Sequence, residues 1–244
     1  MGATINVIGS SSAGNAYILR AGNESLLIEA GVRWSALRPH VLAECGRLRA
    51  CLVSHEHKDH SQSVANVSYY RIPIVASRGT IDAMQFAIDS PVTAFDWVEY
   101  HFGGFKVISF KTQHDAAEPM GFFINHPECG NVVFATDTYY VKPRFKDVRT
   151  WLIECNYCED IATENFANGA FSKSQLERLR TSHMELQQTI NTLKANDLSK
   201  TERIILIHLS DRNSDAERMV EEVKKATGIP TVAALAVGPQ IIKL

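Results

Sequence analysis

The chain has 244 residues, 45% of them hydrophobic and 21% charged, and its formal net charge is −2 at pH 7. This composition is that of an ordinary folded protein with a sizeable core. The charge balance excludes a strongly basic nucleic-acid-binding protein, although it leaves room for a local basic groove. No tract rich in Pro, Gly or Ser divides the sequence, so we predict a single domain over residues 1–244.

The cellular compartment is indicated by the apolar runs and the cysteines. The apolar runs are far shorter than the roughly 18–20 residues needed to cross a bilayer, so we expect no membrane partner. No basic segment followed by an apolar one opens the chain, which predicts no secretory signal. Five cysteines, an odd number, favour reduced thiols in a cytoplasmic protein. Cys155 and Cys158 have the spacing of a redox pair, but an isolated CxxC is weak evidence and we interpret it as coincidental.

The chain begins with three predicted strands, at residues 4–8, 16–19 and 25–28, separated by glycine-containing turns. The turn between the first two strands, residues 9–15, is rich in Ser and Gly and could cradle a phosphate. It lacks the GxGxxG and GxxxxGKS/T spacings, so a purely structural turn is at least as good an interpretation.

Helices and strands then alternate as far as residue 88. The predicted helices cover residues 34–44, 61–70 and 80–88, and the predicted strands cover residues 48–53 and 72–76. Pro39 lies inside the first helix and should kink or divide it. The apolar residues of the third helix recur at helical spacing, and we interpret them as core rather than as cofactor contacts.

The second half of the chain continues with strands and then becomes helical. Strands are predicted at residues 105–110, 121–125, 132–135, 151–154, 204–206 and 231–237, and helices at residues 160–196 and 216–227. The long helical region should be interrupted near Thr181 and Ser182. The last helix is followed by Gly228 and Pro230, which are stop signals. Pattern alone therefore predicts a mixed α and β fold.

The most informative stretch is residues 54–60, Ser-His-Glu-His-Lys-Asp-His, directly after a predicted buried strand. Three imidazoles and a carboxylate are costly to place beside a core unless they bind something. Imidazole and carboxylate are ligands of zinc and of neighbouring divalent metals, and the spacing suits two ions better than one. The other interpretation is a polar surface loop rich in histidine. Three further candidate ligands, each closing an apolar strand, favour the metal site; they are His114, Asp137 and His208.

His-x-His-x-Asp-His after a strand resembles the motif of the metallo-β-lactamase superfamily of hydrolases, and the resemblance extends along most of the chain. Less specific motifs resemble the WalJ/YycJ-like branch of exonucleases and phosphodiesterases; they lie at residues 9–15, 114–119, 154–157 and 208–210. The resemblance implies an α/β (α+β) fold, a four-layer αββα sandwich with the site along one edge between the sheets.

The resemblance also implies the ligands and the metals. Residue by residue, it assigns the first metal to His55, His57 and His114, the second to Asp59, His60 and His208, and a bridging position to Asp137. We expect two divalent ions, Zn²⁺ first and Mn²⁺ second because two carboxylates contribute. A histidine at position 57 argues against di-iron flavoprotein relatives, which place Glu there.

The implied function is a phosphodiesterase or exonuclease that cleaves nucleic-acid or cyclic-nucleotide phosphodiesters with a metal-bridging hydroxide. Asp59 and His183 are the candidate catalytic residues. His183 resembles a non-ligand histidine that phosphodiesterase members place beside the scissile phosphate; the alternative is a histidine on a helix face. A long Gly/Pro-rich arm, with which tRNA-processing relatives grip tRNA, has no counterpart here.

Substrate contacts are weaker predictions. The turn at residues 9–15 lies near the metals in the similar family, which makes Ser12 and Asn15 candidates. Lys142 and Arg144 begin a basic cluster that continues to residue 149 and could neutralise substrate phosphates, or could be a solvated charged surface.

Two other functions stay open at this point. One is a thioesterase or lactonase of the glyoxalase II kind, and the other is a metal-bound binding or sensing protein with little turnover. Retention of every ligand position speaks against the second. The sequence leaves a homodimer open as well.

Overall fold

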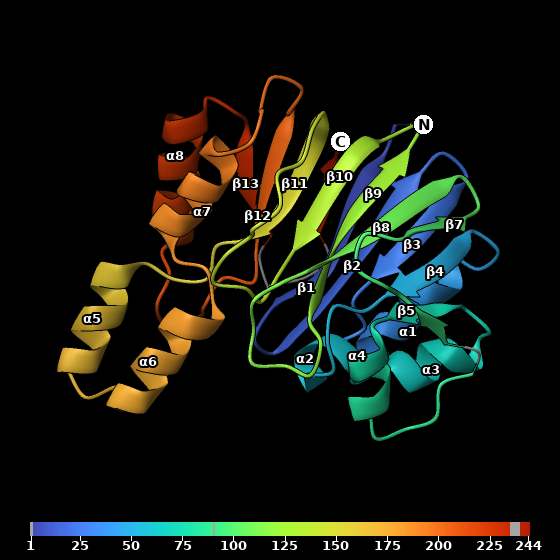
Figure 1. Cartoon of the computed structure of the whole chain (residues 1–244), viewed down its shortest axis with the longest axis horizontal. Helices are drawn as coiled ribbons and strands as arrows, with labels where there is room; N and C mark the ends of the chain where they lie inside the picture. The colour runs from blue at the N-terminus through green and yellow to red at the C-terminus, as the bar shows by residue number, and fades with distance from the viewer. Residues whose placement is uncertain (1, 90, 235–239) are drawn as a thin grey trace.

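The computed structural model describes residues 2–89, 91–234 and 240–244. It consists of two mixed β-sheets packed face to face, with helices on both outer faces (Figure 1). This arrangement confirms the αββα sandwich that the family resemblance of the sequence implies.

The first sheet has the strand order β14-β1-β2-β3-β4-β5-β6. Its strands are β14 (Gln240–Lys243), β1 (Thr4–Ser11), β2 (Gly14–Ala21), β3 (Glu24–Ile28), β4 (Leu48–Leu52), β5 (Ile74–Ala76) and β6 (Val92–Thr93). The pairs from β14 to β3 are antiparallel, and the pairs from β3 to β6 are parallel.

The second sheet has the order β13-β12-β11-β10-β9-β8-β7 and repeats this plan. Its strands are β13 (Thr231–Ala233), β12 (Arg203–Ile207), β11 (Val148–Glu154), β10 (Gly130–Ala135), β9 (Met120–His126), β8 (Phe105–Lys111) and β7 (Glu99–Phe102). The pairs from β7 to β10 are antiparallel, and those from β10 to β13 are parallel.

This topology gathers the ends of distant strands. Parallel strands deliver their carboxyl ends to one edge of a sheet, where sites form in open α/β structures. In the second sheet β10, β11 and β12 end there, at Ala135, Glu154 and Ile207. Strand β8 lies two antiparallel steps from β10, so it runs in the same direction and ends at the same edge, at Lys111. In the first sheet β4 ends at Leu52, just before the His-rich stretch.

The core lies between the sheets. It includes Tyr17 from the first sheet and Phe105, Phe122 and Phe134 from the second, all fully buried. The outer face of the first sheet is covered by α1 (Trp34–Ala43), α3 (Val64–Tyr69) and α4 (Arg78–Ala83), and that of the second by α7 (Leu186–Lys194) and α8 (Ala216–Thr227). Nowhere in the described part of the chain is a helix long and apolar enough to span a bilayer.

Several predicted boundaries were wrong. The helix after the His-rich stretch begins earlier than predicted, because the short helix α2 (Lys58–Ser61) already contains Asp59 and His60. The helix predicted at residues 80–88 ends at Ala83, although its later apolar side chains do pack into the core. Strands β6, β7 and β14 were not predicted, and residues 235–237 of the last predicted strand lie outside the described residues.

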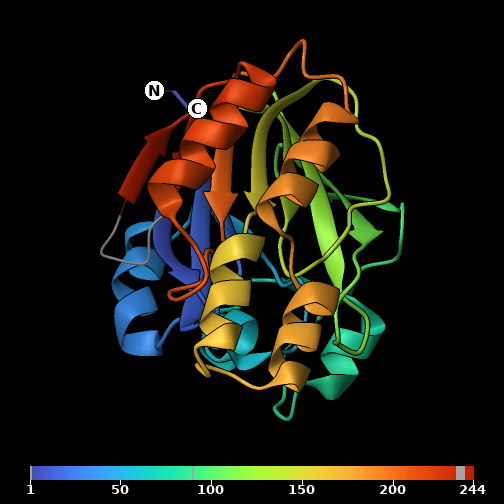
Figure 2. The same ribbon diagram turned by 90° about the vertical axis from the view of Figure 1, so that its left-hand side faces the viewer.

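The helices α5 (Glu159–Ala167) and α6 (Lys173–Ser182) form a hairpin that stands apart from both sheets (Figures 1 and 2). The hairpin has a small apolar cluster of its own, made by Tyr157, Ala162, Phe166, Phe171, Leu176 and Leu179. A capping box formed by Ser172 and Gln175 begins α6. The interruption predicted within residues 160–196 is confirmed, since α6 ends at Ser182.

The first prediction concerns Gly31, which follows β3. A Cβ at this position would overlap the backbone carbonyl of Asp59 in α2, and the neighbouring Ala30 N donates to His60 O at 2.9 Å. Gly31→Ala should therefore push α2 away and destabilise the fold by about 1–3 kcal/mol, as overpacking usually does. Urea unfolding measures the change. Gly2→Ala is the control, because nothing lies within 4 Å of its added Cβ. A Gly31 variant as stable as the control would contradict this packing.

Candidate metal centre

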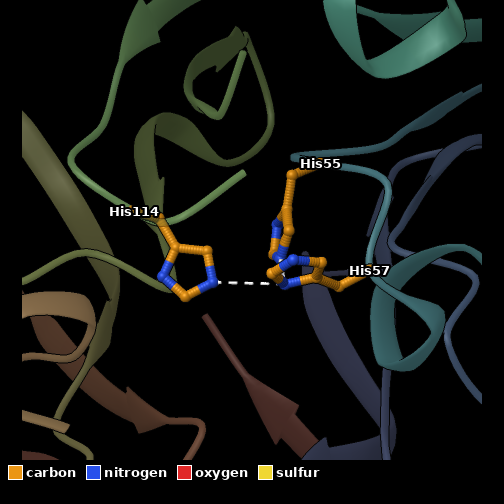
Figure 3. Close-up of side chains that lie close together, drawn as sticks. All are labelled: His55, His57 and His114. Carbon is orange, nitrogen blue, oxygen red and sulfur yellow. Dashed lines mark hydrogen bonds between the residues drawn. The ribbon is translucent and has the colours of Figure 1, made fainter. Parts of the chain in front are cut away.

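Three histidines direct ring nitrogens at one another at the edge between the sheets (Figure 3). His57 Nδ1 lies 3.1 Å from His55 Nε2 and 3.3 Å from His114 Nε2. His55 and His57 come from the segment after β4, and His114 comes from the segment after β8. Thus two sheets each contribute to one cluster of nitrogen donors.

The chemistry of these rings suits a cation. His114 Nδ1 lies 2.9 Å from the carbonyl oxygen of Ser182, which can only accept, so this nitrogen carries the proton. In the neutral ring the lone pair is then on Nε2, which faces the cluster. Burial holds the pKa of His55 well below its ordinary value, with the His60 charge adding to the effect, and burial also lowers the pKa of His114. Neutral imidazole is the form that binds metals.

A second group combines carboxylates and imidazoles. His60 Nε2 lies 3.3 Å from Asp59 Oδ2 and 3.3 Å from Asp137 Oδ1, and His208 Nδ1 lies 3.2 Å from Asp137 Oδ1. The other carboxylate oxygen of Asp137 lies 3.4 Å from His114 Nε2. Asp137 therefore faces both groups at once.

Opposite charges dominate this second group. Burial would raise the pKa of Asp137, but the charges of His208 and His60 hold it well below its ordinary value. Burial would lower the pKa of His208, but Asp137, Asp59 and Glu154 raise it to about 10. The carboxylates that raise the pKa of His208 carry negative charge, which a divalent cation bound in place of the proton would also neutralise.

The donor atoms form three overlapping groups that could each hold a metal ion; the third consists of Asp137, Glu154, His183 and His208, and the other two match the predicted ligand sets. In one group the ligand atoms of His55, His57 and His114 lie within 4.8 Å of one another, and in the other those of Asp59, His60, Asp137 and His208 do so. His208 Nε2 is buried and has no hydrogen-bond partner among the described residues. Its nearest charged neighbour is Asp59 Oδ2, at 3.6 Å, and a cation between the two atoms would satisfy both. Nitrogen and carboxylate donors are those preferred by zinc and manganese.

Two buried glutamates contact the Nδ1 atoms of three histidines, His60, His183 and His208. Glu29 Oε2 lies 3.3 Å from His60 Nδ1. Glu154 Oε1 lies 2.7 Å from His183 Nδ1 and 3.0 Å from His208 Nδ1. Such outer carboxylates fix the orientation of a ligating ring. Sequence reasoning missed both glutamates, although each closes an apolar strand as the ligands do.

The backbone at these strand ends is strained. Glu29, Asp137 and His208 have φ of 63°, 44° and 56°, in the left-handed region that side-chain-bearing residues rarely adopt. Each residue follows the end of a strand within two positions. Such backbone conformations cluster at functional sites.

A cavity of about 380 Å³ lies over both groups, and the remaining predicted site residues differ in their relation to it. Ser12 lines the cavity together with Asp59 and His183. Asn15 is fully buried beneath it, where its amide donates to the backbone oxygens of Ser11 and Asp59. The part that Ser12 and Asn15 take in substrate binding stays a prediction.

His183 is not on a helix face. It is the C-cap residue of α6, with extended φ and ψ of −131° and 156°. Its ring centroid lies 5.3 Å from that of His208 and 5.4 Å from that of His114. Burial would lower its pKa, but the charge and hydrogen bond of Glu154 raise it above the ordinary value.

The predicted basic cluster lies elsewhere. Lys142 and Arg144 do not line the cavity, and the Arg144 guanidinium donates to nearby backbone carbonyls. Arg149 pairs with Glu202 near the start of β11, at the opposite end of that strand from the site. The cavity instead contains Arg178 of α6, which sequence reasoning did not single out.

Comparison with known proteins agrees with this geometry. Residues 25–209 match the family model described as "Beta-lactamase superfamily domain". The exodeoxyribonuclease YycJ of Bacillus anthracis is 32% identical over 157 residues, which cover 61% of this chain and 59% of that protein. The exodeoxyribonuclease WalJ of Streptococcus pneumoniae serotype 2 (strain D39 / NCTC 7466) is 27% identical over 235 residues, or 89% and 85% of the two chains.

Among solved structures, the metallo-β-lactamase fold protein YhfI from Bacillus subtilis aligns with a TM-score of 0.72 and 16% identity, covering 99% of this chain and 100% of that one. Its identity is low, so it speaks for the fold alone. The family model, by contrast, spans more than half of the sequence and includes the His-rich stretch and the strand ends that converge on it. The chain therefore belongs to the beta-lactamase superfamily and is a metal-dependent hydrolase of the metallo-β-lactamase fold.

Proposed function

We propose that the protein is a dinuclear-metal phosphodiesterase that acts as an exonuclease on DNA. The observation that carries the proposal is the Glu154–His183 pair, which presents a proton donor at the metal cavity. A phosphodiester needs such a donor, because its leaving oxygen is a poor leaving group until it is protonated. Two relatives named as exodeoxyribonucleases support DNA as the substrate.

The residues divide into two metal sites. His55, His57 and His114 would hold the first ion, Asp59, His60 and His208 the second, and Asp137 both, with Zn²⁺ preferred over Mn²⁺. When bound, two such cations supply Lewis acidity toward phosphate oxygens and lower the pKa of water from near 16 toward about 7.

The chain's own residues supply proton transfer and orientation. Glu154 accepts a hydrogen bond from His183 Nδ1, so Nε2 is the nitrogen that can reach the substrate. As the bond between phosphorus and the leaving oxygen breaks, His183 donates a proton to that oxygen. Asp59 lines the same cavity, and its carboxylate orients the attacking water by accepting a hydrogen bond.

The proposal is tested by assaying the metal-reconstituted protein side by side on end-labelled single-stranded DNA, bis-p-nitrophenyl phosphate, cyclic nucleotides and a glutathione thioester. We expect release of nucleotides from an end of the DNA and negligible thioester hydrolysis. Preferential hydrolysis of the thioester would replace this function with that of the glyoxalase II kind.

The second prediction concerns metal stoichiometry. The wild-type protein should bind two divalent ions per chain, and Asp137→Ala should weaken both sites because its carboxylate faces both groups. His114→Ala should lower occupancy of the first site and spare the second. Metal titration followed by elemental analysis measures both effects. If the Asp137 variant retained one ion at wild-type affinity, Asp137 would not be shared.

The third prediction concerns His183→Ala. Since His183 Nδ1 is engaged by Glu154, the variant should keep two metals while kcat on DNA falls about 100-fold or more, the usual loss of a general acid. KM should change little, because proton donation strengthens in the transition state. His101→Ala, on an exposed part of β7, is the control. Unchanged turnover would remove His183 from catalysis, and loss of metal would make it a ligand.

The fourth prediction concerns pH. Glu154 raises the pKa of His183, which keeps the imidazole protonated to higher pH. Glu154→Gln removes that charge, so the pKa should fall and the alkaline limb of the kcat profile should move to lower pH. The profile is measured at saturating metal, with the exposed Glu217→Gln as control. An alkaline limb in the same place as in the wild type would show that His183 is not the titrating acid.

A further inference from the structure

A second hollow adjoins the metal cavity. It has a volume of about 360 Å³ and shares His114 with the cavity, while Gln113, Pro119, Tyr139 and Ser182 form other parts of its lining. Tyr139 is 42% exposed, although it lies two residues after the buried Asp137. The lining thus combines an accessible aromatic ring and a proline ring with hydroxyl and amide groups.

The position of Tyr139 relative to the metal centre is fixed. Gln113 N donates to Thr138 Oγ1 at 2.9 Å, and Tyr139 N donates to Gln113 O at 3.3 Å. These bonds join the residue before His114 to the two residues after Asp137. Because both loops also carry proposed metal ligands, the backbone of Tyr139 is tied to the candidate metal centre.

Arg178 stands between the hollow and the cavity. It lines the metal cavity, and its Nε donates to Asp115 Oδ2 at 2.8 Å, while Asp115 lines the hollow. The Arg178 side chain is 66% exposed, so part of the guanidinium is free to meet a ligand. The end of α6 is anchored nearby, where Ser182 O accepts from His114 Nδ1.

We propose that the hollow and Arg178 together form a nucleotide subsite, in which a base stacks on Tyr139 and Arg178 binds a phosphate of the same strand. This inference rests on the proposed nuclease function. Aromatic rings accept any base by stacking, and a guanidinium suits phosphate oxygens. The lining also includes Gln113 and Ser182, whose amide and hydroxyl groups are of the kind that hydrogen-bond the edges of bases.

The test measures binding of the metal-loaded protein to a fluorescently labelled, phosphorothioate-linked single-stranded oligonucleotide, which resists cleavage. An abasic strand of the same length and charge is measured in parallel. Tyr139→Ala should weaken binding of the base-containing strand by about 5- to 100-fold, the usual range for one lost stacking contact, and leave the abasic strand unchanged. Tyr140→Ala is the control, because Tyr140 is similarly exposed but does not line the hollow.

Arg178→Gln should weaken the binding of both strands. It should also make the slope of log affinity against log salt shallower by about 0.7, which corresponds to the loss of one phosphate contact on a single strand. Arg180→Gln is its control, since Arg180 is on the same helix and pairs with Glu159 away from the cavity. A Tyr139 variant that binds both strands like wild type, or an Arg178 variant that matches the Arg180 variant, would overturn the subsite.

The two proposals fail in different ways. Wild-type protein that cleaves DNA while the Tyr139 and Arg178 variants match their controls would overturn the subsite alone. Wild-type protein that shows the expected binding differences but does not cleave unmodified DNA would overturn the nuclease function alone. Protein that neither binds nor cleaves single-stranded DNA would overturn both.

Discussion

The structure depends on the contact of one carboxylate, Asp137, with two groups of imidazoles. One of its oxygens lies 3.4 Å from His114 Nε2, and the other lies 3.3 Å from His60 Nε2. A buried carboxylate is costly unless positive charge or hydrogen bonds surround it. Thr136 Oγ1 donates to Asp137 Oδ1 at 2.9 Å, and the neighbouring Thr138 N is tied to Glu154 at 2.7 Å. Histidines from both sheets surround this carboxylate and offset its charge.

The same edge carries a cost in stability. Glu29, Asp137 and Glu154 are buried carboxylates, and three residues of the site adopt left-handed backbone conformations. Proteins commonly break local rules where function requires it and offset the cost elsewhere. Here the apolar core between the sheets and the two helical layers provide the offset. Removing one member of a buried charged pair should therefore destabilise the protein more than replacing both.

The sequence predicted that these histidines and carboxylates lie together, because the spacing of the His-rich stretch and its place after a strand are local features. It predicted the sandwich only through resemblance to a family, since alternation of apolar residues does not specify which strands pair. Glu154 ends a predicted strand at the site edge, yet nothing local shows that it contacts His183 and His208, which are 29 and 54 residues away. Arg178 enters the cavity only because α5 and α6 fold into a hairpin. The basic residues at 142–149 follow Asp137 in sequence, but the chain turns away toward the start of β11.

The central claim is that two metal ions occupy this edge. It is tested most directly by anomalous diffraction at the zinc and manganese absorption edges, on crystals of protein never exposed to a chelator. The account predicts two peaks roughly 3.5–4 Å apart, on either side of Asp137. One should contact His55, His57 and His114, and the other should contact Asp59, His60 and His208. A single peak, or a peak that is coordinated by His183 and Glu154 instead, would contradict the account.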